Sequence, residues 1–219
     1  MKLEEYPDRD MMMIDLANQL AGELEECLLV HEFASFAVPG GTTPGPVFDA
    51  LSAAPLDWTR VHVMPTDERM VPAGHDRSNE KLIRERLLTG RAADAGFLGF
   101  AGRSEDLDGL ATDLAPNLPI SVLLLGMGSD MHTASLFPGA DELTAALDKG
   151  APPVMKITAP GAPEPRLTLT RPVLEGAMST HVLISGNEKR EALHRAAAAT
   201  LEEAPIKAVL ANATVHWAP

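Results

Sequence analysis

Asp130 and His132 are the two residues of this 219-residue sequence best suited to acid–base chemistry. They follow the apolar run Leu123–Leu125 and a Gly126–Gly128 bend that contains two glycines. A carboxylate beside an imidazole can orient the ring and raise its basicity, which activation of a water molecule requires near neutral pH. The alternative is a loop histidine that only bonds backbone groups, and the sequence alone leaves both interpretations open.

A second polar group follows another apolar run, Val61–Met64. Asp67, Glu68 and Arg69 are consecutive ionisable residues at a position where a buried strand has just ended, and Ser78-Asn79 begins a predicted helix shortly afterwards. An isolated charge triplet is more often a solvated turn, with Ser78 as the helix cap. Its place after a strand favours Asp67 and Arg69 as site residues.

The turn Pro39–Pro44 has the composition of a phosphate-binding segment. Gly40 and Gly41 allow a tight turn, and Thr43 can cap a helix that has Pro44 at its first position. Backbone amides of such a turn and of a helix N-terminus attract phosphate, which makes this turn a candidate phosphate site. An ordinary strand-to-helix turn with good capping would look the same.

Cations are scarce in this chain, which makes the position of each one informative. There are 18 Lys and Arg residues against 31 Asp and Glu, giving a net charge of −13. This charge would repel nucleic acid and anionic membranes, so an anionic ligand must be small and locally captured. Arg166 at a strand start and Lys189 at a helix start are the predicted cations for a phosphate, although each alone could be a surface residue.

Other classes of protein fit the sequence poorly. No segment reaches the roughly 18 apolar residues of a membrane span, and no His-x-x-x-His or Cys-x-x-Cys spacing suggests a metal site. No cofactor motif is present either. The charged first ten residues and the single cysteine, Cys27, favour a reducing cytoplasm.

The elements that must position these residues alternate along the chain. Apolar spacing predicts helices over residues 9–32, 44–52, 78–89, 104–114 and 188–199, with a short one from His132, and strands over 33–38, 61–64, 120–125, 154–157, 166–170, 182–185 and 213–217. This order predicts one α/β domain over residues 1–219, with a mostly parallel, Rossmann-like sheet covered by helices on both faces in three layers. Ligands of such sheets bind beyond the carboxyl ends of the strands.

Together these segments resemble the 6-phosphogluconolactonase family, which belongs to a larger group with glucosamine-6-phosphate deaminase. The resemblance covers nearly the whole chain. It is carried by Gly40-Gly41-Thr42-Thr43-Pro44, Asp67-Glu68-Arg69 with Val71-Pro72 and Ser78-Asn79, Leu125-Gly126-Met127-Gly128 with Asp130 and His132-Thr133-Ala134-Ser135-Leu136-Phe137-Pro138-Gly139, Arg166 to Thr170, and Glu188-Lys189-Arg190. The run that begins at His132 is the most specific, because deaminases of this group typically have His-Ile-Ala-Phe-Asn-Glu there.

The resemblance implies hydrolysis of 6-phospho-D-glucono-1,5-lactone to 6-phosphogluconate in the oxidative pentose phosphate pathway, by a monomer or small homo-oligomer without metal or cofactor. It makes His132 the general base, with Asp130 and Asp67 shaping the site and Arg69 stabilising charge. The implied phosphate contacts are Gly40, Gly41, Thr42, Thr43, Arg166 and Lys189.

Two positions depart from the family pattern: Met131 stands where the family usually has Gly, and Thr42 where it often has Ser. If position 131 requires positive φ, Met131 costs roughly 1 to 2 kcal/mol.

Two other functions stay open at this point. An isomerase or deaminase acting on an amino-sugar phosphate could use the same carboxylate and histidine, although the acidic residue that deaminases carry after the histidine has no match here. A non-catalytic sugar-phosphate sensor would keep the phosphate contacts while Met131 disabled His132.

Overall fold

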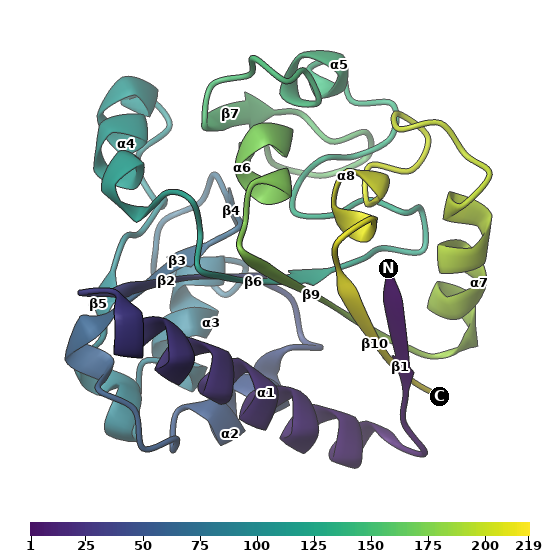
Figure 1. Cartoon of the computed structure of the whole chain (residues 1–219). Coiled ribbons are helices and arrows are strands. Elements are labelled where there is room, and N and C mark those ends of the chain that lie inside the picture. Colours follow the sequence, from purple (N-terminus) through teal and green to yellow (C-terminus); the bar gives the residue numbers. More distant parts are fainter.

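A seven-stranded sheet forms the centre of the protein, and each of its strand pairs is parallel (Figure 1). The structure is a computed structural model that describes residues 1–219. In spatial order the strands are β1 (Lys2–Glu5), β10 (Thr214–Ala218), β9 (Ser179–Ser185), β6 (Val122–Gly126), β2 (Ala34–Val38), β3 (Val61–Pro65) and β5 (Gly96–Phe97). The predicted mostly parallel α/β sheet is therefore confirmed.

Helices cover both faces of this sheet. Buried side chains of α1 (Arg9–Val30), α2 (Gly45–Leu51) and α3 (Asn79–Arg86) pack in one apolar cluster. A second cluster contains side chains from α4 (Leu107–Leu114), α5 (Leu143–Ala146), α6 (Arg171–Glu175), α7 (Asn187–Ala196) and α8 (Lys207–Leu210). Short 3₁₀ helices span Trp58–Arg60, Gly90–Asp94 and Ala115–Asn117. The sheet thus lies between two layers, as predicted.

Strand β6 shows why the central strands are continuously apolar. Leu123 and Leu125 contribute to one cluster, whereas Val122 and Leu124 contribute to the other. Successive side chains of a strand point to opposite faces, so a strand covered on both faces needs apolar residues at every position.

A smaller antiparallel sheet, β4-β8-β7, lies beside the main one. It contains β4 (Asp67–Arg69), β8 (Arg166–Leu169) and β7 (Val154–Ile157). The strands at 154–157 and 166–170 were predicted, but their pairing was not. In the observed register Asp67 lies opposite Thr168, and Arg69 lies opposite Arg166.

The strand order reverses between β2 and β6, which are neighbours in the main sheet. From β2 the chain proceeds to β3 on one side, whereas from β6 it proceeds to β9 and β10 on the other. A crevice opens at such a switch point, beyond the carboxyl ends of the strands. The Pro39–Pro44 turn follows β2 and the Gly126–His132 segment follows β6, so the topology brings the two together.

Several local predictions were wrong or incomplete. No helix begins at His132: the segment forms turns, Ala134 has a φ of 48°, and the next helix starts at Leu143. Thr43 does not cap α2, because Pro44 occupies the cap position and no side-chain cap bond forms. Strands β1, β4 and β5 and helices α5, α6 and α8 were not predicted. No helix has both the length and the apolar character that crossing a membrane requires.

Candidate active site

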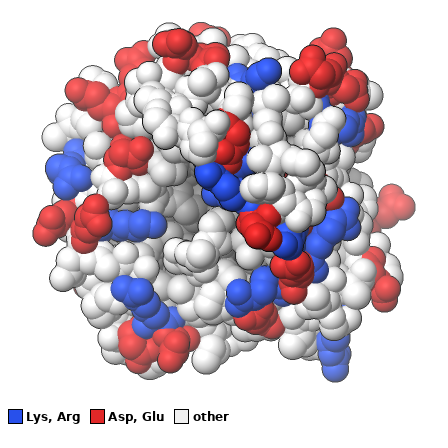
Figure 2. Space-filling view, turned by 180° about the vertical axis from the view of Figure 1, so that it is seen from behind, with Lys and Arg blue, Asp and Glu red and all other residues white.

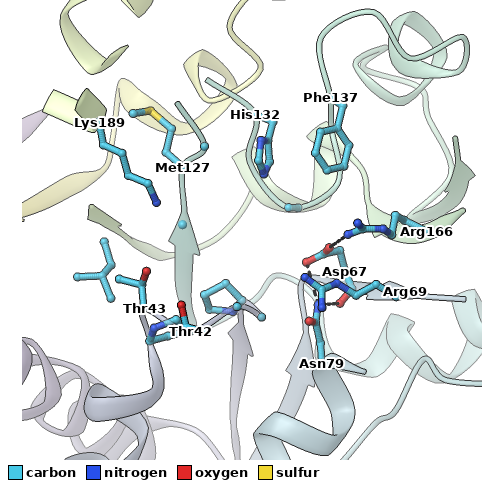
Figure 3. Close-up of a pocket in the computed structure, with 18 residues that line it drawn as sticks. Thr42, Thr43, Asp67, Arg69, Asn79, Met127, His132, Phe137, Arg166 and Lys189 are labelled. Atoms are coloured by element: carbon cyan, nitrogen blue, oxygen red, sulfur yellow. Dashed lines mark hydrogen bonds and ion pairs between the residues drawn. The ribbon is translucent and has the colours of Figure 1, made fainter. Parts of the chain in front are cut away.

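A cavity of about 290 Å³ lies at the switch point. The face seen in Figure 2 is hollowed near its centre, with Lys and Arg side chains on both sides of the hollow. The cavity contains every predicted site residue except Asp130. Its lining consists of Pro39, Gly40, Gly41, Thr42, Thr43, Pro44, Asp67, Arg69, Asn79, Gly126, Met127, Gly128, His132, Ala134, Phe137, Arg166, Leu183 and Lys189 (Figure 3).

His132 and Asp130 form the predicted pair. Nδ1 of His132 lies 2.5 Å from Oδ1 of Asp130, and the His132 ring packs 4.3 Å from the Phe137 ring, measured between centroids. Burial is the largest influence on Asp130 and opposes its ionisation, but the hydrogen bonds from the His132 side chain and backbone and the charge of His132 together outweigh burial and lower the pKa of Asp130. With Nδ1–H donated to the ionised carboxylate, Nε2 keeps its lone pair and can accept a proton.

Gly128 makes this pair possible. A Cβ atom at position 128 would lie 2.2 Å from Nδ1 of His132 and 2.4 Å from Oδ1 of Asp130. Its backbone N–H also donates to the carbonyl oxygen of His132 at 3.0 Å. Any side chain at this position would displace the imidazole or the carboxylate.

Met131 adopts a φ of 67°, in the left-handed region that favours glycine. The conformation is held at both ends of the residue: its N–H donates to Gly128 O at 3.0 Å, and its carbonyl accepts from the N–H of Ile206 at 3.2 Å. Its side chain packs against the larger apolar cluster. The His132–Asp130 contact is nevertheless formed, so Met131 does not move the histidine away from its carboxylate.

Arg69 and Arg166 are cross-strand neighbours at one end of the cavity. Like charges directly opposite each other destabilise a strand pair. Asp67 is the nearby counter-ion, with Oδ2 4.0 Å from Nη1 of Arg166. Burial lowers the pKa of Arg166 and the charge of Arg69 lowers it further, although Asp67 opposes the shift. This end of the cavity therefore favours an additional anion.

Lys189 lies on the opposite side of the cavity from both arginines, near Thr42 and Thr43 (Figure 3). Burial lowers the pKa of Lys189, and only the neighbouring Glu188 opposes the shift. Gly41 has a φ of 87°, so the turn between β2 and α2 uses the conformational freedom of its glycine. The predicted phosphate residues are thus divided: Lys189 and the turn lie at one end, and Arg166 lies at the other.

Three residues that contact Asp67 or His132 were not predicted as site residues: Ser135, Asn79 and Phe137. Ser135 is fully buried, and its Oγ donates to Oδ2 of Asp67 at 2.6 Å. Asn79 donates through Nδ2 to the carbonyl oxygen of Asp67 at 2.8 Å, and Phe137 covers the histidine ring. Ser135 and Phe137 stand in the family-like run after His132, and Asn79 in the predicted Ser78-Asn79 helix start, so the motifs held a signal for all three. No group of three or more His, Cys, Asp or Glu side chains is placed to hold a metal ion.

Comparisons with known proteins agree with this architecture. A family model described as glucosamine-6-phosphate isomerases/6-phosphogluconolactonase matches residues 7–217. The chain is 42% identical to a 6-phosphogluconolactonase of Pseudomonas aeruginosa, over 93% of this chain and 89% of that protein. It is 40% identical to a 6-phosphogluconolactonase of Rhizobium meliloti, over 93% of each chain.

A solved structure shows the same likeness in three dimensions. The crystal structure of a 6-phosphogluconolactonase from Shewanella baltica superposes with a TM-score of 0.95 at 32% identity, covering 100% of this chain and 97% of that one. Family match, sequence identity and backbone likeness each extend over almost the whole chain. The protein is therefore a member of the glucosamine-6-phosphate isomerase/6-phosphogluconolactonase family.

Proposed function

We propose that this protein hydrolyses 6-phosphoglucono-1,5-lactone to 6-phosphogluconate, with His132 as the general base. The observation that carries the proposal is the His132–Asp130 contact of 2.5 Å beside a cavity with cations at both ends. The names and near-complete coverage of its relatives support the same reaction.

The divided cations suggest how the substrate is oriented. Lys189, Thr42 and Thr43 hold the phosphate at one end, with the turn amides as further donors. The lactone carbonyl then faces Arg69 and Arg166 at the other end, with His132 between (Figure 3). The phosphate is remote from the reacting carbon, so its binding energy serves to position the lactone.

In the reaction itself, Nε2 of His132 takes a proton from water while the water oxygen bonds to the lactone carbonyl carbon. The negative charge that develops on the carbonyl oxygen is stabilised by the guanidinium groups of Arg69 and Arg166. The tetrahedral intermediate collapses, the bond between the carbonyl carbon and the ring oxygen breaks, and the imidazolium gives its proton to that oxygen, which becomes a hydroxyl group. Asp130 holds the imidazole in the required tautomer and stabilises the imidazolium.

The test is proton release in weak buffer from freshly generated lactone, measured beside the spontaneous rate. His132→Ala should lower kcat by about 10²- to 10⁴-fold, the usual contribution of a general base. His31→Ala, exposed at the end of α1 and outside the cavity, is the matched control and should leave the rate unchanged. Parental activity in His132→Ala would exclude the proposed base, and a parent without activity would exclude the reaction and make an amino-sugar phosphate the next substrate to assay.

A further inference from the structure

Glu68 is a buried carboxylate directly behind the cavity wall. Its neighbours in β4, Asp67 and Arg69, line the cavity, and alternation along the strand turns Glu68 to the opposite side. The residue is only 1% exposed. A buried carboxylate without partners would be strongly destabilising. The hydrogen-bond partners of Glu68 therefore identify the segments that this side chain positions.

Both oxygens of Glu68 accept two hydrogen bonds. Oε1 accepts from the backbone N–H groups of Arg69 and Asn79, each at 2.8 Å. Oε2 accepts from Oγ of Ser78 at 3.1 Å and from the N–H of Glu80 at 2.7 Å. Burial raises the pKa of Glu68, and these four donors oppose the rise. The carboxylate therefore joins β4 to the first residues of α3.

These contacts fix both ends of an exposed loop. Residues 70–77 connect β4 to α3, and most of them are exposed. Arg69 precedes the loop and Asn79 follows it, and both line the cavity. Nη1 of Arg69 also donates to the carbonyl oxygen of Arg77, at the far end of the loop, at 2.6 Å.

Asn79 links this carboxylate to the opposite end of the cavity. Its Nδ2 donates to the carbonyl oxygen of Asp67 at 2.8 Å, and a Cβ atom at Gly40 would lie 1.8 Å from its Oδ1. The Asn79 side chain thus packs directly between β4 and the turn that we assign to the phosphate. A shift of Asn79 would therefore displace β4 at one end of the substrate and the Gly40–Thr43 turn at the other.

We propose that Glu68 is a positioning residue for substrate binding, which sets Arg69 through its backbone N–H and sets the Gly40–Thr43 turn through Asn79. This inference rests on the proposed function. A helix cap with a purely structural role would stabilise α3 without affecting the substrate, and kinetics can separate the two roles.

The first variant is Glu68→Gln. An amide group presents N–H toward donors that need an acceptor, so at least one of the four hydrogen bonds is lost. We expect the KM for the lactone to rise about tenfold because the Gly40–Thr43 turn moves, and kcat to fall as well because Arg69 stabilises the charge that develops on the carbonyl oxygen, while the His132–Asp130 pair stays in place. Glu68→Asp keeps the charge and should recover part of the KM.

The matched control is Glu80→Gln. Glu80 is 8% exposed, lies in the first turn of the same helix, and its side chain pairs with Arg84 at 2.9 Å rather than with a cavity residue. The Glu80→Gln variant removes the same charge from the same region, and its KM should stay within about twofold of that of the parent.

The outcomes separate the two proposals. A parent that hydrolyses the lactone, with an unchanged KM in Glu68→Gln, would overturn the role of Glu68 and leave the proposed function intact. If the parent does not hydrolyse the lactone, calorimetric binding of inorganic phosphate tests Glu68 independently: several-fold weaker binding in Glu68→Gln than in Glu80→Gln supports the role, and equal binding refutes it. Should Glu68→Gln not fold, the same comparison is made with Glu68→Asp.

Discussion

Met131 occupies a backbone conformation that side chains other than glycine rarely adopt, immediately before the proposed base. Met131 has a φ of 67°, so the condition under which this residue costs backbone strain is met. The residue is tolerated because neighbouring backbone groups hold it at both ends and its side chain contributes to the apolar cluster. A cost of about 1 kcal/mol in local strain is thus offset by packing.

We expect Met131→Gly to leave kcat/KM within about threefold of the parent, because His132 already contacts Asp130, and to change stability by less than about 1.5 kcal/mol.

Met131→Val should destabilise the protein by about 2 kcal/mol or more, since a β-branched residue fits positive φ poorly. Urea unfolding and lactone hydrolysis measure both. A large rise in activity in Met131→Gly would instead show that Met131 impairs the site.

At the level of elements, the N-terminal strand and helix are attached to the sheet by a buried polar network. His181 in β9 and His216 in β10 lie 2.9 Å apart, Nδ1 to Nε2. Glu23 of α1 contacts Nε2 of His181 at 2.9 Å, and the Tyr6 hydroxyl lies 3.0 Å from Nδ1 of His216. Burial, and then the charge of His181, lower the pKa of His216 to about 4, although Glu4 opposes the shift.

This network predicts that the protein loses stability in mild acid. The pKa of His216 is lowered from 6.5 to about 4 by folding. The unfolded chain therefore binds this proton first as the pH falls. The stability that neutral His216 confers is fully present above about pH 6.5 and is lost as the pH falls toward 4, with about 2 kcal/mol lost between pH 7 and pH 5.

Urea unfolding of the parent and of His216→Asn at pH 7, 6 and 5 measures this loss. The variant is less stable at pH 7 because a buried network is disrupted, but its free energy of unfolding should fall less steeply with pH. Parallel pH dependences in the two proteins would assign the acid sensitivity to other groups.

The elements that the sequence predicts well are those whose signal is local. Helix α1 and strand β6 stand out because their apolar residues follow one period or form one run. Strands β1 and β4, with sequences Lys-Leu-Glu-Glu and Asp-Glu-Arg, are short and polar, and only their partners make them strands. The helix expected from His132 fails because the positive φ of Ala134 is imposed by the site rather than by propensity.

The site follows the same division. Its members after β2, β3, β6 and β9 could be predicted, because parallel strands bring their carboxyl ends to one edge. The contact of Ser135 with Asp67 joins residues 68 positions apart, and the opposition of Arg69 and Arg166 depends on a strand register. Neither pairing has a local signature in the sequence. Because the second pairing places Arg166 beside Arg69, the sequence also could not show that Arg166 and Lys189 lie at opposite ends of the cavity.

At the scale of the whole molecule, the order of the strands makes the two ends of the chain unequal. β10 lies inside the sheet between β1 and β9, whereas β1 is an edge strand. β10 also carries the fully buried Val215, and its Trp217 donates from Nε1 to the carbonyl oxygen of Gly186 at 3.0 Å. Loss of an interior strand removes pairing on two sides and apolar contacts on both faces.

We therefore expect deletion of residues 214–219 to abolish cooperative unfolding, whereas deletion of residues 1–5 should leave a folded protein of lower stability. Thermal unfolding followed by circular dichroism distinguishes the two. A cooperative transition in the C-terminal deletion would show that β9 can serve as an edge.

The parallel pairing of β1 with β10 also bears on how the protein is made. Strand β1 emerges from the ribosome long before β10 has been synthesised, and β10 is the only partner of β1 in the sheet. The residues that line the candidate site follow β2, β3, β6 and β9 or lie in β6, β8 or β9, and all of them emerge earlier than β10. During synthesis the segments of the candidate site are therefore available before β10 is, and β1 can join the sheet only after β10 has been made.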